Sequence, residues 1–278
     1  MHIVVDIGGT KTRVAAAENF ESFGAPLIFE SSHDYRQGFA NIVAAAHELA
    51  GEAKIEGMAL GAPGVISKDK RRLVHVPNLP HWNGAAICPD LEKALGAPAL
   101  LENDAAFVAL GEAVVGAGKG AAIVAYITIS TGVNGARVVD GVVDRSAQGF
   151  EMGEQILGVD LTSPTFEFIA SGVMVEQRFG KPPHELGADH PVWDELARIT
   201  AIAVHNTIAY WSPDRVVIGG SMMNEIGISI DRVRDYLSSL SRKNPSLPEV
   251  VHGALGEVGG LWGALVALRD MGARGGRN

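Results

Sequence analysis

The sequence predicts an α/β protein in which one strand-turn-strand unit occurs twice. Short apolar runs typical of buried strands alternate with longer stretches in which apolar residues recur at helical spacing, and this alternation is typical of α/β folds. The N-terminal stretch IVVDIGGTKTRVA (residues 3–15) and the central stretch AYITISTGVNGARVV (residues 125–139) share one order: an apolar strand, a Gly/Thr turn and a second strand. This similarity indicates an internal duplication.

Composition excludes several classes of protein. The chain has 278 residues, of which 47% are hydrophobic and 20% charged, enough for one large domain or two of moderate size. A formal charge of -9 argues against nucleic acid and anionic membranes as partners, because both need clustered Lys and Arg. A single cysteine, Cys88, rules out an intramolecular disulfide and a multi-cysteine zinc site. With no signal-like segment and no apolar run of membrane-spanning length, we expect a cytoplasmic protein without a membrane partner.

The first half begins with a hairpin. Residues 2–18 read as two strands joined by a tight Gly-rich turn. Residues 36–53 have the spacing of a helix, and a short strand at 57–60 runs into a turn that contains glycine and proline. A strand at 100–102 follows, and the helix after it begins at Asp104. We expect Asp104 either to cap this helix or to complement its positive end.

The second half repeats the hairpin and adds three helices. Strands are predicted on both sides of the turn at residues 130–135, and a buried strand at 216–218 ends at a glycine pair. The predicted helices cover residues 162–179, 193–211 and 258–271, and the last is apolar almost all round and therefore expected to be buried. The tail GARGGRN (residues 272–278) is expected to be disordered.

The Gly-rich turns indicate phosphate binding of an unusual kind. Both stand between two strands, so neither fits the dinucleotide fingerprint or the GxxxxGK[ST] loop, which lie between a strand and a helix. A GGT turn still offers backbone N–H groups and a hydroxyl, which can hold phosphate oxygens. Asp6 ends the strand before the first turn, and a carboxylate beside phosphate needs a cation such as Mg²⁺ between them. A tight turn with no ligand remains the alternative interpretation.

Several motifs, taken together, resemble the ROK family of bacterial sugar kinases and sugar-responsive repressors. In chain order they are DIGGTK (6–11), GAPGVI (61–66), PNLPHW (77–82), ENDAAFVALGE (102–112), STGVNGARVVDG (130–141), EMG (151–153) and VVIGGS (216–221). The resemblance implies an actin-like ATPase (ribonuclease H-like) fold, with two α/β domains around a cleft in which ATP and a hexose meet. The expected small domain comprises residues 1–105 and 264–278, and the large one 106–263. No helix-turn-helix segment precedes the first strand, which disfavours the repressor branch.

The resemblance also implies roles for individual residues. Asp104 matches the catalytic base, and Asp6 the carboxylate near Mg²⁺, which it would reach through phosphate or water. The residues expected to hold ATP are Gly8, Gly9, Thr10 and Lys11 in the first turn, Ser130, Thr131 and Gly132 in the second, and Gly219, Gly220 and Ser221 beside the nucleoside. The residues expected to bind the sugar are Asn78, Asn103, Asp104, Glu151, Glu154 and Glu167.

The chain departs from the family pattern at two points that bear on sugar specificity. Most members have histidine where this chain has Glu154, and the cysteine cluster that usually follows is missing. We therefore expect no structural zinc. A glutamate offers only acceptors, whereas a neutral imidazole offers a donor and an acceptor, so a substitution changes which hydroxyl pattern is satisfied. Whether Glu154 or Gln155 takes the place of the histidine stays open.

The sequence therefore predicts an ATP-dependent, Mg²⁺-requiring sugar kinase that acts on a hydroxyl of a hexose, the primary one being the first choice. Glucose is the first candidate, followed by fructose, mannose and an N-acetylated amino sugar, and the protein is expected to be a homodimer. Polyphosphate is disfavoured as donor because a long polyanion needs a basic track. Two alternatives remain: a non-catalytic sugar sensor of the same fold, and another actin-like ATPase.

Overall fold

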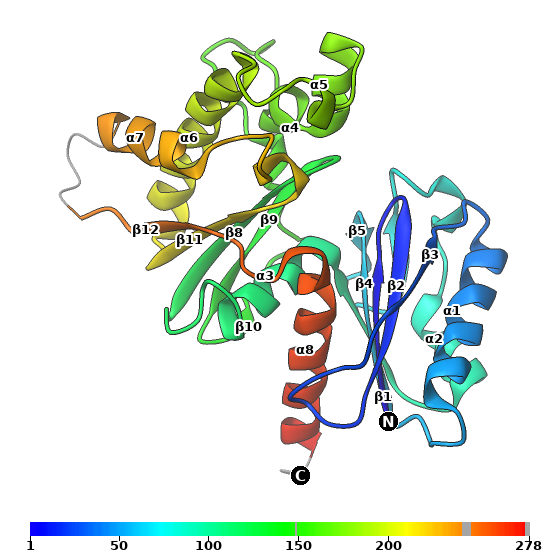
Figure 1. Cartoon of the computed structure of the whole chain (residues 1–278). Helices are drawn as coiled ribbons and strands as arrows, with labels where there is room; N and C mark the ends of the chain where they lie inside the picture. Colours follow the sequence, from blue (N-terminus) through cyan, green and yellow to red (C-terminus); the bar gives the residue numbers. More distant parts are fainter. Residues whose placement is uncertain (148, 241–245, 276–278) are drawn as a thin grey trace. The chain divides into compact units, whose positions relative to one another are not determined.

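The chain divides into two compact units. The computed structural model describes residues 1–147, 149–240 and 246–275 (Figure 1). Unit 1 comprises Met1–Gly111, Arg145–Gly149 and the chain from Glu257 onward, and unit 2 comprises Glu112–Asp144 and Phe150–Gly256. The chain first leaves unit 1 after residue 111 and returns to it for the last time after residue 256. The sequence predicted these two boundaries after residues 105 and 263.

Unit 1 is built on a mixed sheet with strand order β3-β2-β1-β4-β7. The predicted N-terminal hairpin is present: β1 and β2 pair antiparallel, with Ile7 opposite Thr12 at the turn. β1, β4 and β7 run parallel, so their carboxyl ends lie at one edge of the sheet. The strands are β1 (His2–Ile7), β2 (Lys11–Ala17), β3 (Leu27–Glu30), β4 (Gly57–Ala62) and β7 (Ala99–Asn103), with a separate small hairpin of β5 (Val65–Ile66) and β6 (Leu73–His75).

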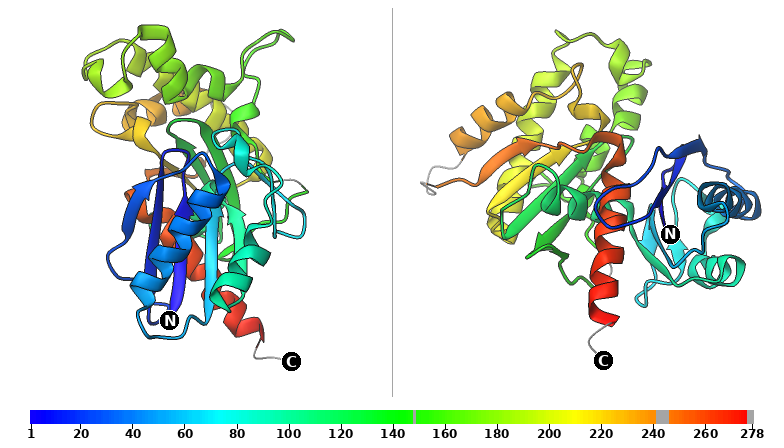
Figure 2. Two further views of the ribbon diagram at one scale, coloured as in Figure 1. Left: turned by 90° about the vertical axis from the view of Figure 1, so that its right-hand side faces the viewer. Right: turned by 60° about the horizontal axis from the view of Figure 1, so that its bottom comes forward.

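Helices cover both faces of this sheet. α1 and α2 pack on one face, and α8 packs on the other against β1, β2 and β4 (Figure 2). The predicted burial of the last helix is confirmed, because Leu261, Leu265 and Leu268 are 0–2% exposed. The helices of unit 1 are α1 (Tyr35–Ala50), η1 (Pro80–Trp82), α2 (Ile87–Leu95), η5 (Gly256–Val258), which starts one residue inside unit 2, and α8 (Gly259–Gly275); α3 (Asp104–Val114) begins here and continues into unit 2.

Unit 2 repeats the plan of unit 1. Its sheet has the order β10-β9-β8-β11-β12, again with an antiparallel hairpin at β8 and β9 and parallel pairing of β8, β11 and β12. The matching strand order supports the predicted duplication. The elements are β8 (Ile123–Ile129), β9 (Val133–Val139), β10 (Val142–Val143), η2 (Met152–Glu154), α4 (Phe166–Ala170), α5 (Gly172–Phe179), η3 (Pro183–Glu185), α6 (Val192–Trp211), β11 (Arg215–Gly219), η4 (Ser221–Met223), α7 (Ile230–Leu240) and β12 (Glu249–His252).

Some sequence-based boundaries were wrong for identifiable reasons. The predicted helix at 36–53 ends at Ala50, because Gly51 adopts a positive φ of 56° and terminates it. The predicted helix at 162–179 is two helices, since Ser171 has extended backbone and its side chain caps α5. α8 continues through Gly275, so residues 272–275 of the expected disordered tail are helical, and residues 276–278 lie outside the described residues.

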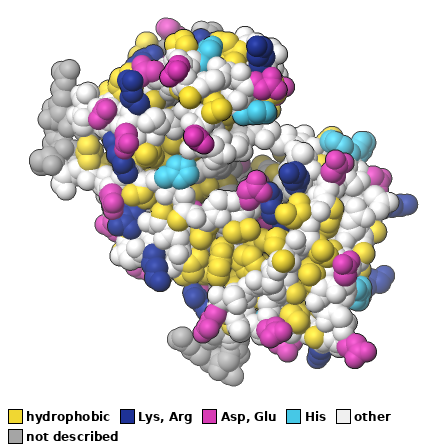
Figure 3. Space-filling model, viewed as in Figure 1, with side chains coloured by type: hydrophobic (Ala, Val, Ile, Leu, Met, Phe, Trp, Pro, Cys, Tyr) yellow, Lys and Arg dark blue, Asp and Glu magenta, His cyan; other side chains and the backbone are white. Residues whose placement is uncertain are grey.

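The charge distribution agrees with the acidic composition. On the face drawn in Figure 3, Lys and Arg side chains are scattered singly among Asp and Glu, and they form no continuous basic track there. Among the helices in the described part of the chain, none combines the length and apolarity needed to cross a membrane.

Candidate active site

Two carboxylates meet at the edge of unit 1 where β1, β4 and β7 end. Asp6 of β1 pairs in register with Gly61 of β4, and Gly61 pairs with Glu102 of β7. Gly61 lies next to both acids: a Cβ built on it would lie 3.5 Å from Asp104 Cα and 3.7 Å from Asp6 Oδ1. The sheet register therefore brings Asp6 and Asp104 close to the same glycine, as expected at the carboxyl ends of parallel strands.

Burial and mutual repulsion set the charge state of this pair. The pKa of Asp6 is raised to about 7, first by burial and then by the nearby Asp104 carboxylate, while Arg13 acts to lower it. Burial also raises the pKa of Asp104 to about 6, against hydrogen bonds from backbone N–H groups that lower it. Carboxyls with pKa values this close to neutrality are typical of catalytic sites.

Asp104 does not cap α3. The cap is Asn103, whose Oδ1 accepts a hydrogen bond from the Ala106 N–H at 3.2 Å and whose Nδ2 donates to the Gly64 carbonyl at 3.1 Å. Asp104 is the first helical residue, and its Oδ1 accepts from its neighbour Ala105 at 2.8 Å. The cap predicted for Asp104 is therefore wrong, whereas its place at the positive end of the helix holds. The helix cap and the carboxyl that the sequence predicts to be the base therefore belong to different, adjacent residues.

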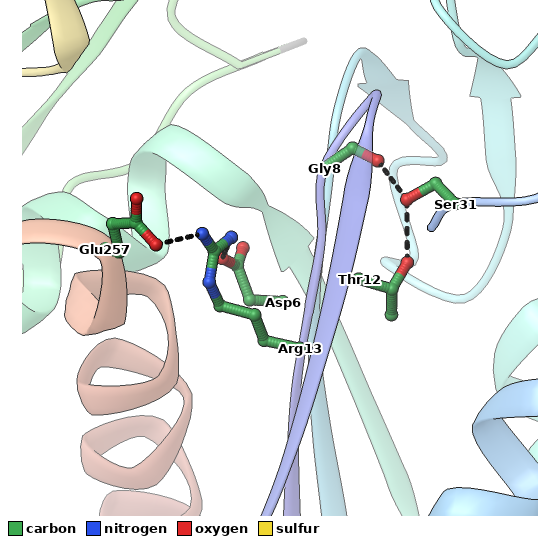
Figure 4. A network of polar contacts seen from close by, with 6 residues as sticks. All are labelled: Asp6, Gly8, Thr12, Arg13, Ser31 and Glu257. Atoms are coloured by element: carbon green, nitrogen blue, oxygen red, sulfur yellow. Dashed lines mark hydrogen bonds and ion pairs between the residues drawn. The ribbon is translucent and has the colours of Figure 1, made fainter. Parts of the chain in front are cut away.

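Two further groups lie close to Asp6, and neither was predicted from the sequence. Gly260 lies at the start of α8, and a Cβ built there would come 2.8 Å from the Asp6 carboxyl carbon, so the first turn of this helix closely approaches the acid. Arg13 places Nη1 3.8 Å from Asp6 Oδ2 and Nη2 2.7 Å from Glu257 Oε2 (Figure 4). Asp6 thus lies between a helix N-terminus and a guanidinium.

The first Gly-rich turn is tightly closed and is tied to a neighbouring segment. The Gly8 N–H donates to the Lys11 carbonyl at 2.9 Å, which closes the turn and uses an amide that we expected to serve phosphate. Thr10 and Lys11 are exposed. A Cβ built on Gly9 would lie 2.9 Å from Asn78 Cβ, so the PNLPHW segment packs directly on the turn. The structure thus brings together a candidate sugar ligand and the candidate phosphate turn.

Unit 2 gathers the second turn and the VVIGGS motif at one edge of its own sheet. Gly219 of β11 pairs with Thr128 of β8, and the hydroxyls of Ser130 and Ser221 lie 3.0 Å apart. Gly220 has a φ of 98°, in the region that favours glycine. All the residues expected beside the nucleoside, and those of the second turn, therefore lie close together: Ser130, Thr131, Gly132, Gly219, Gly220 and Ser221.

The acidic residues proposed for sugar binding differ in how firmly they are held. Glu167 Oε2 accepts from the Val133 N–H at 2.7 Å, at the end of the second turn. Glu151 and Glu154 are exposed on either side of the buried Met152 in η2. Gln155 donates from Nε2 to the Met152 carbonyl at 3.2 Å, and its Oε1 is buried without a hydrogen-bond partner.

A comparison with protein families identifies the family of this chain. A family model described as the ROK family matches residues 2–270. The chain belongs to the ROK family.

Several relatives of this chain are named as sugar kinases. The glucokinase of Thermotoga maritima is 26% identical over 77% of this chain and 79% of its own length, and the N-acetyl-D-glucosamine kinase of Vibrio cholerae is 26% identical over 95% and 98%. The ROK glucokinase of Streptomyces griseus, solved with glucose and AMPPNP, superposes with a TM-score of 0.82 at 24% identity and covers 97% of this chain and 99% of its own. The predicted family and the actin-like ATPase fold are confirmed, and the kinase relatives support the predicted enzyme class, a sugar kinase.

This ROK chain departs from the zinc-binding pattern in its composition. Its only cysteine, Cys88, is buried in unit 1. Over the described ranges, no three His, Cys, Asp or Glu side chains converge in a way that could hold a metal ion.

Proposed function

We propose that this ROK protein transfers the γ-phosphoryl group of ATP to a hydroxyl of a hexose, with Asp104 as general base. The observation that carries the proposal is the Asp6–Asp104 pair at the edge of the unit 1 sheet. Phosphoryl transfer requires a group that accepts the proton of the attacking hydroxyl. A carboxylate with a pKa of about 6 is ionised at neutral pH and basic enough to take that proton as the hydroxyl oxygen attacks phosphorus.

We infer that both Gly-rich turns contribute to binding ATP. In the first turn the candidates are the exposed Thr10 and Lys11 together with Gly9, since the Gly8 amide is used within the turn. In unit 2 the Ser130 hydroxyl, paired with Ser221, is a second polar contact for phosphate or ribose. The AMPPNP complex of the Streptomyces griseus glucokinase supports ATP as donor.

We propose that Mg²⁺ is held near Asp6, through phosphate or water. The residues fit a cation: two carboxyls face the same edge, and each has a pKa raised by burial, so each is more stable with a positive charge nearby. When bound, Mg²⁺ would neutralise charge on the transferred phosphoryl group. Arg13 keeps Asp6 oriented by contacting its Oδ2 side.

Sugar binding is assigned to polar groups in both units. We propose Asn78 and Asn103 with Asp104 in unit 1, and Glu151, Glu154 and Glu167 in unit 2. Asn103 already has its oxygen and one amide hydrogen engaged, which leaves one N–H for a hydroxyl. Gln155 is the better replacement for the missing histidine than Glu154, because its buried Oε1 lacks a partner whereas Glu154 is exposed.

The substrate itself is proposed as glucose, phosphorylated on its primary hydroxyl. Relatives named as a glucokinase and an N-acetyl-D-glucosamine kinase make glucose and N-acetylated amino sugars the leading candidates, with fructose and mannose next. We also propose a cytoplasmic homodimer that uses no zinc.

The decisive experiment follows ADP release with a panel of hexoses, hexosamines and N-acetylhexosamines at saturating Mg·ATP. We expect release that depends on one or a few of these sugars. Binding of each sugar is measured alongside by calorimetry. Sugar binding without any sugar-dependent ADP would instead identify a sensor, and ADP release that needs no sugar would identify a different ATPase.

A further inference from the structure

Ser31 makes three hydrogen bonds around the first Gly-rich turn, although it lies outside every motif. Its hydroxyl donates to the Gly8 carbonyl at 2.7 Å, and its N–H donates to the Thr10 carbonyl at 2.9 Å. The Thr12 hydroxyl lies 2.8 Å from the Ser31 hydroxyl (Figure 4). A hydroxyl has one proton, and that of Ser31 goes to Gly8, so Thr12 is the donor in this pair.

These bonds fix two peptide planes of the turn. In a trans peptide the carbonyl of one residue and the N–H of the next point in opposite directions. Because the Gly8 and Thr10 carbonyls are both turned toward Ser31, the N–H groups of Gly9 and Lys11 both point away from it. Two donors aimed to the same side of a turn form a concave site for an anion.

We propose that Ser31 is a positioning residue that orients the Gly9 and Lys11 amides toward the phosphates of ATP. This inference rests on the proposed function, because it takes the turn to be a phosphate site. Ser31 itself does not touch ATP in this role. Thr12 supports it from β2: buried at 1% exposure, it holds the Ser31 hydroxyl in the rotamer that reaches Gly8.

The test compares Ser31→Ala with a matched control, Ser32→Ala. Ser32 Oγ accepts from the Asp34 N–H at 3.2 Å and makes no hydrogen bond to the turn among the described residues, so its loss leaves the turn untouched. We expect Ser31→Ala to weaken binding of Mg·AMPPNP and to raise the KM for ATP by roughly three- to tenfold, the value of one hydrogen bond. The KM for the sugar should change less than about twofold. Ser31→Thr, which keeps the hydroxyl, should restore the affinity, and Thr12→Val should have a smaller effect than Ser31→Ala.

The outcomes separate this inference from the proposed function. If the wild-type protein binds no Mg·AMPPNP, the proposed function fails. If the wild type binds but folded Ser31→Ala binds equally well, or loses sugar and nucleotide affinity alike, the positioning role is refuted while the kinase assignment stands. Should Ser31→Ala fail to fold, Ser31→Cys, which keeps the side-chain volume with a weaker donor, is measured instead, and wild-type affinity there refutes the role equally.

Discussion

The two Gly-rich turns share a plan but are secured by different chemistry. In unit 1 the carbonyls of Gly8 and Thr10 are bound by one residue, Ser31, that follows β3. In unit 2 the carbonyls of Ser130 and Thr131 accept from the first two N–H groups of α5, at 2.7 and 3.5 Å. In both cases each bound carbonyl turns the next N–H to the opposite side. Both hairpins therefore have two turn carbonyls bound by a neighbouring segment, but the bound carbonyls belong to alternate residues in the first turn and to consecutive residues in the second.

The turns also differ in charge. The first has a helix N-terminus and Arg13 beside its acid, whereas the second has Glu167 bonded to the Val133 N–H that ends it. Unit 1 combines its turn with a pair of carboxylates of raised pKa. We therefore expect substitutions in unit 1 to affect chemistry and those in unit 2 to affect binding and local stability.

The largest expected effect is that of Asp104→Asn. Loss of the general base should lower kcat by about 10²- to 10⁴-fold, while the helix keeps its Asn103 cap. Sugar-dependent ADP release measures the change. Asp231→Asn, an acidic residue in the first turn of α7, is the matched control and should leave the rate unaltered. Near-wild-type turnover in Asp104→Asn would exclude this residue as the base.

The same variant should be more stable than the wild type above pH 7. The pKa of Asp104 is raised from 3.8 to about 6 on folding, so the folded state binds more protons and stability falls as pH rises between these values. Removing the charge should therefore increase the free energy of unfolding by about 1–2 kcal/mol at pH 8, and by much less at pH 4. Urea titrations of both proteins at the two pH values measure this, and equal shifts at both would contradict a raised pKa.

The rate itself should depend on pH through the same group. Because the base must be ionised, kcat/KM should fall as pH drops through about 6. Initial rates between pH 5 and 8.5, with Mg·ATP saturation checked at each point, give the profile. An acid limb near pH 4 would mean that Asp104 is not desolvated in the free enzyme.

In unit 2, Glu167→Ala should act on stability as well as on sugar binding. It leaves the Val133 N–H without its acceptor, which costs about 1–3 kcal/mol when that group is buried. Glu167→Gln keeps an oxygen for this bond and should recover most of the stability. Thermal unfolding and the KM for the sugar are measured for both. If Glu167→Gln restores stability and also the sugar KM, the residue has only a structural role.

The smallest expected effect is that of Glu257→Gln. Glu257 is 77% exposed, so its ion pair with Arg13 is screened by water and contributes less than about 1 kcal/mol. Arg13→Met should be more harmful, because it also removes the positive charge beside Asp6. We expect ADP release within twofold of the wild type for Glu257→Gln and a raised Mg²⁺ requirement for Arg13→Met. If the two substitutions had equal effects, the Arg13–Glu257 ion pair would be the contact that matters, and the contact between Arg13 and Asp6 would not.

The sequence was sufficient to predict local secondary structure and motifs. It did not predict contacts between segments that are distant along the chain. Both hairpins and the strand before Asp104 follow from apolar runs and glycines. α7 was missed although Val233 and Leu237 have helical spacing and are buried, because most of the other residues of this helix are polar or charged. The short β3, with alternate residues exposed, gives only a weak strand signal.

The residues that surround the site could not be predicted from the spacing of residues along the sequence. Ser31 lies 23 residues from Gly8, and Gly260 reaches Asp6 from the other end of the chain. Neither residue belongs to a repeated pattern, and their roles depend on how strands and helices pack. The cap of α3 could have been assigned, because Asn103 is as good a cap as Asp104 and lies one residue earlier.

The buried Trp82 gives this protein an optical probe of its own. Its indole Nε1 donates to the Ser32 carbonyl at 2.9 Å, and its ring packs edge-on against Tyr35. Ser32 directly follows the residue that holds the first turn, and Trp82 ends the segment that packs on Gly9. We expect any movement of the turn on nucleotide binding to alter the environment of this indole. Intrinsic fluorescence can follow nucleotide binding without any label.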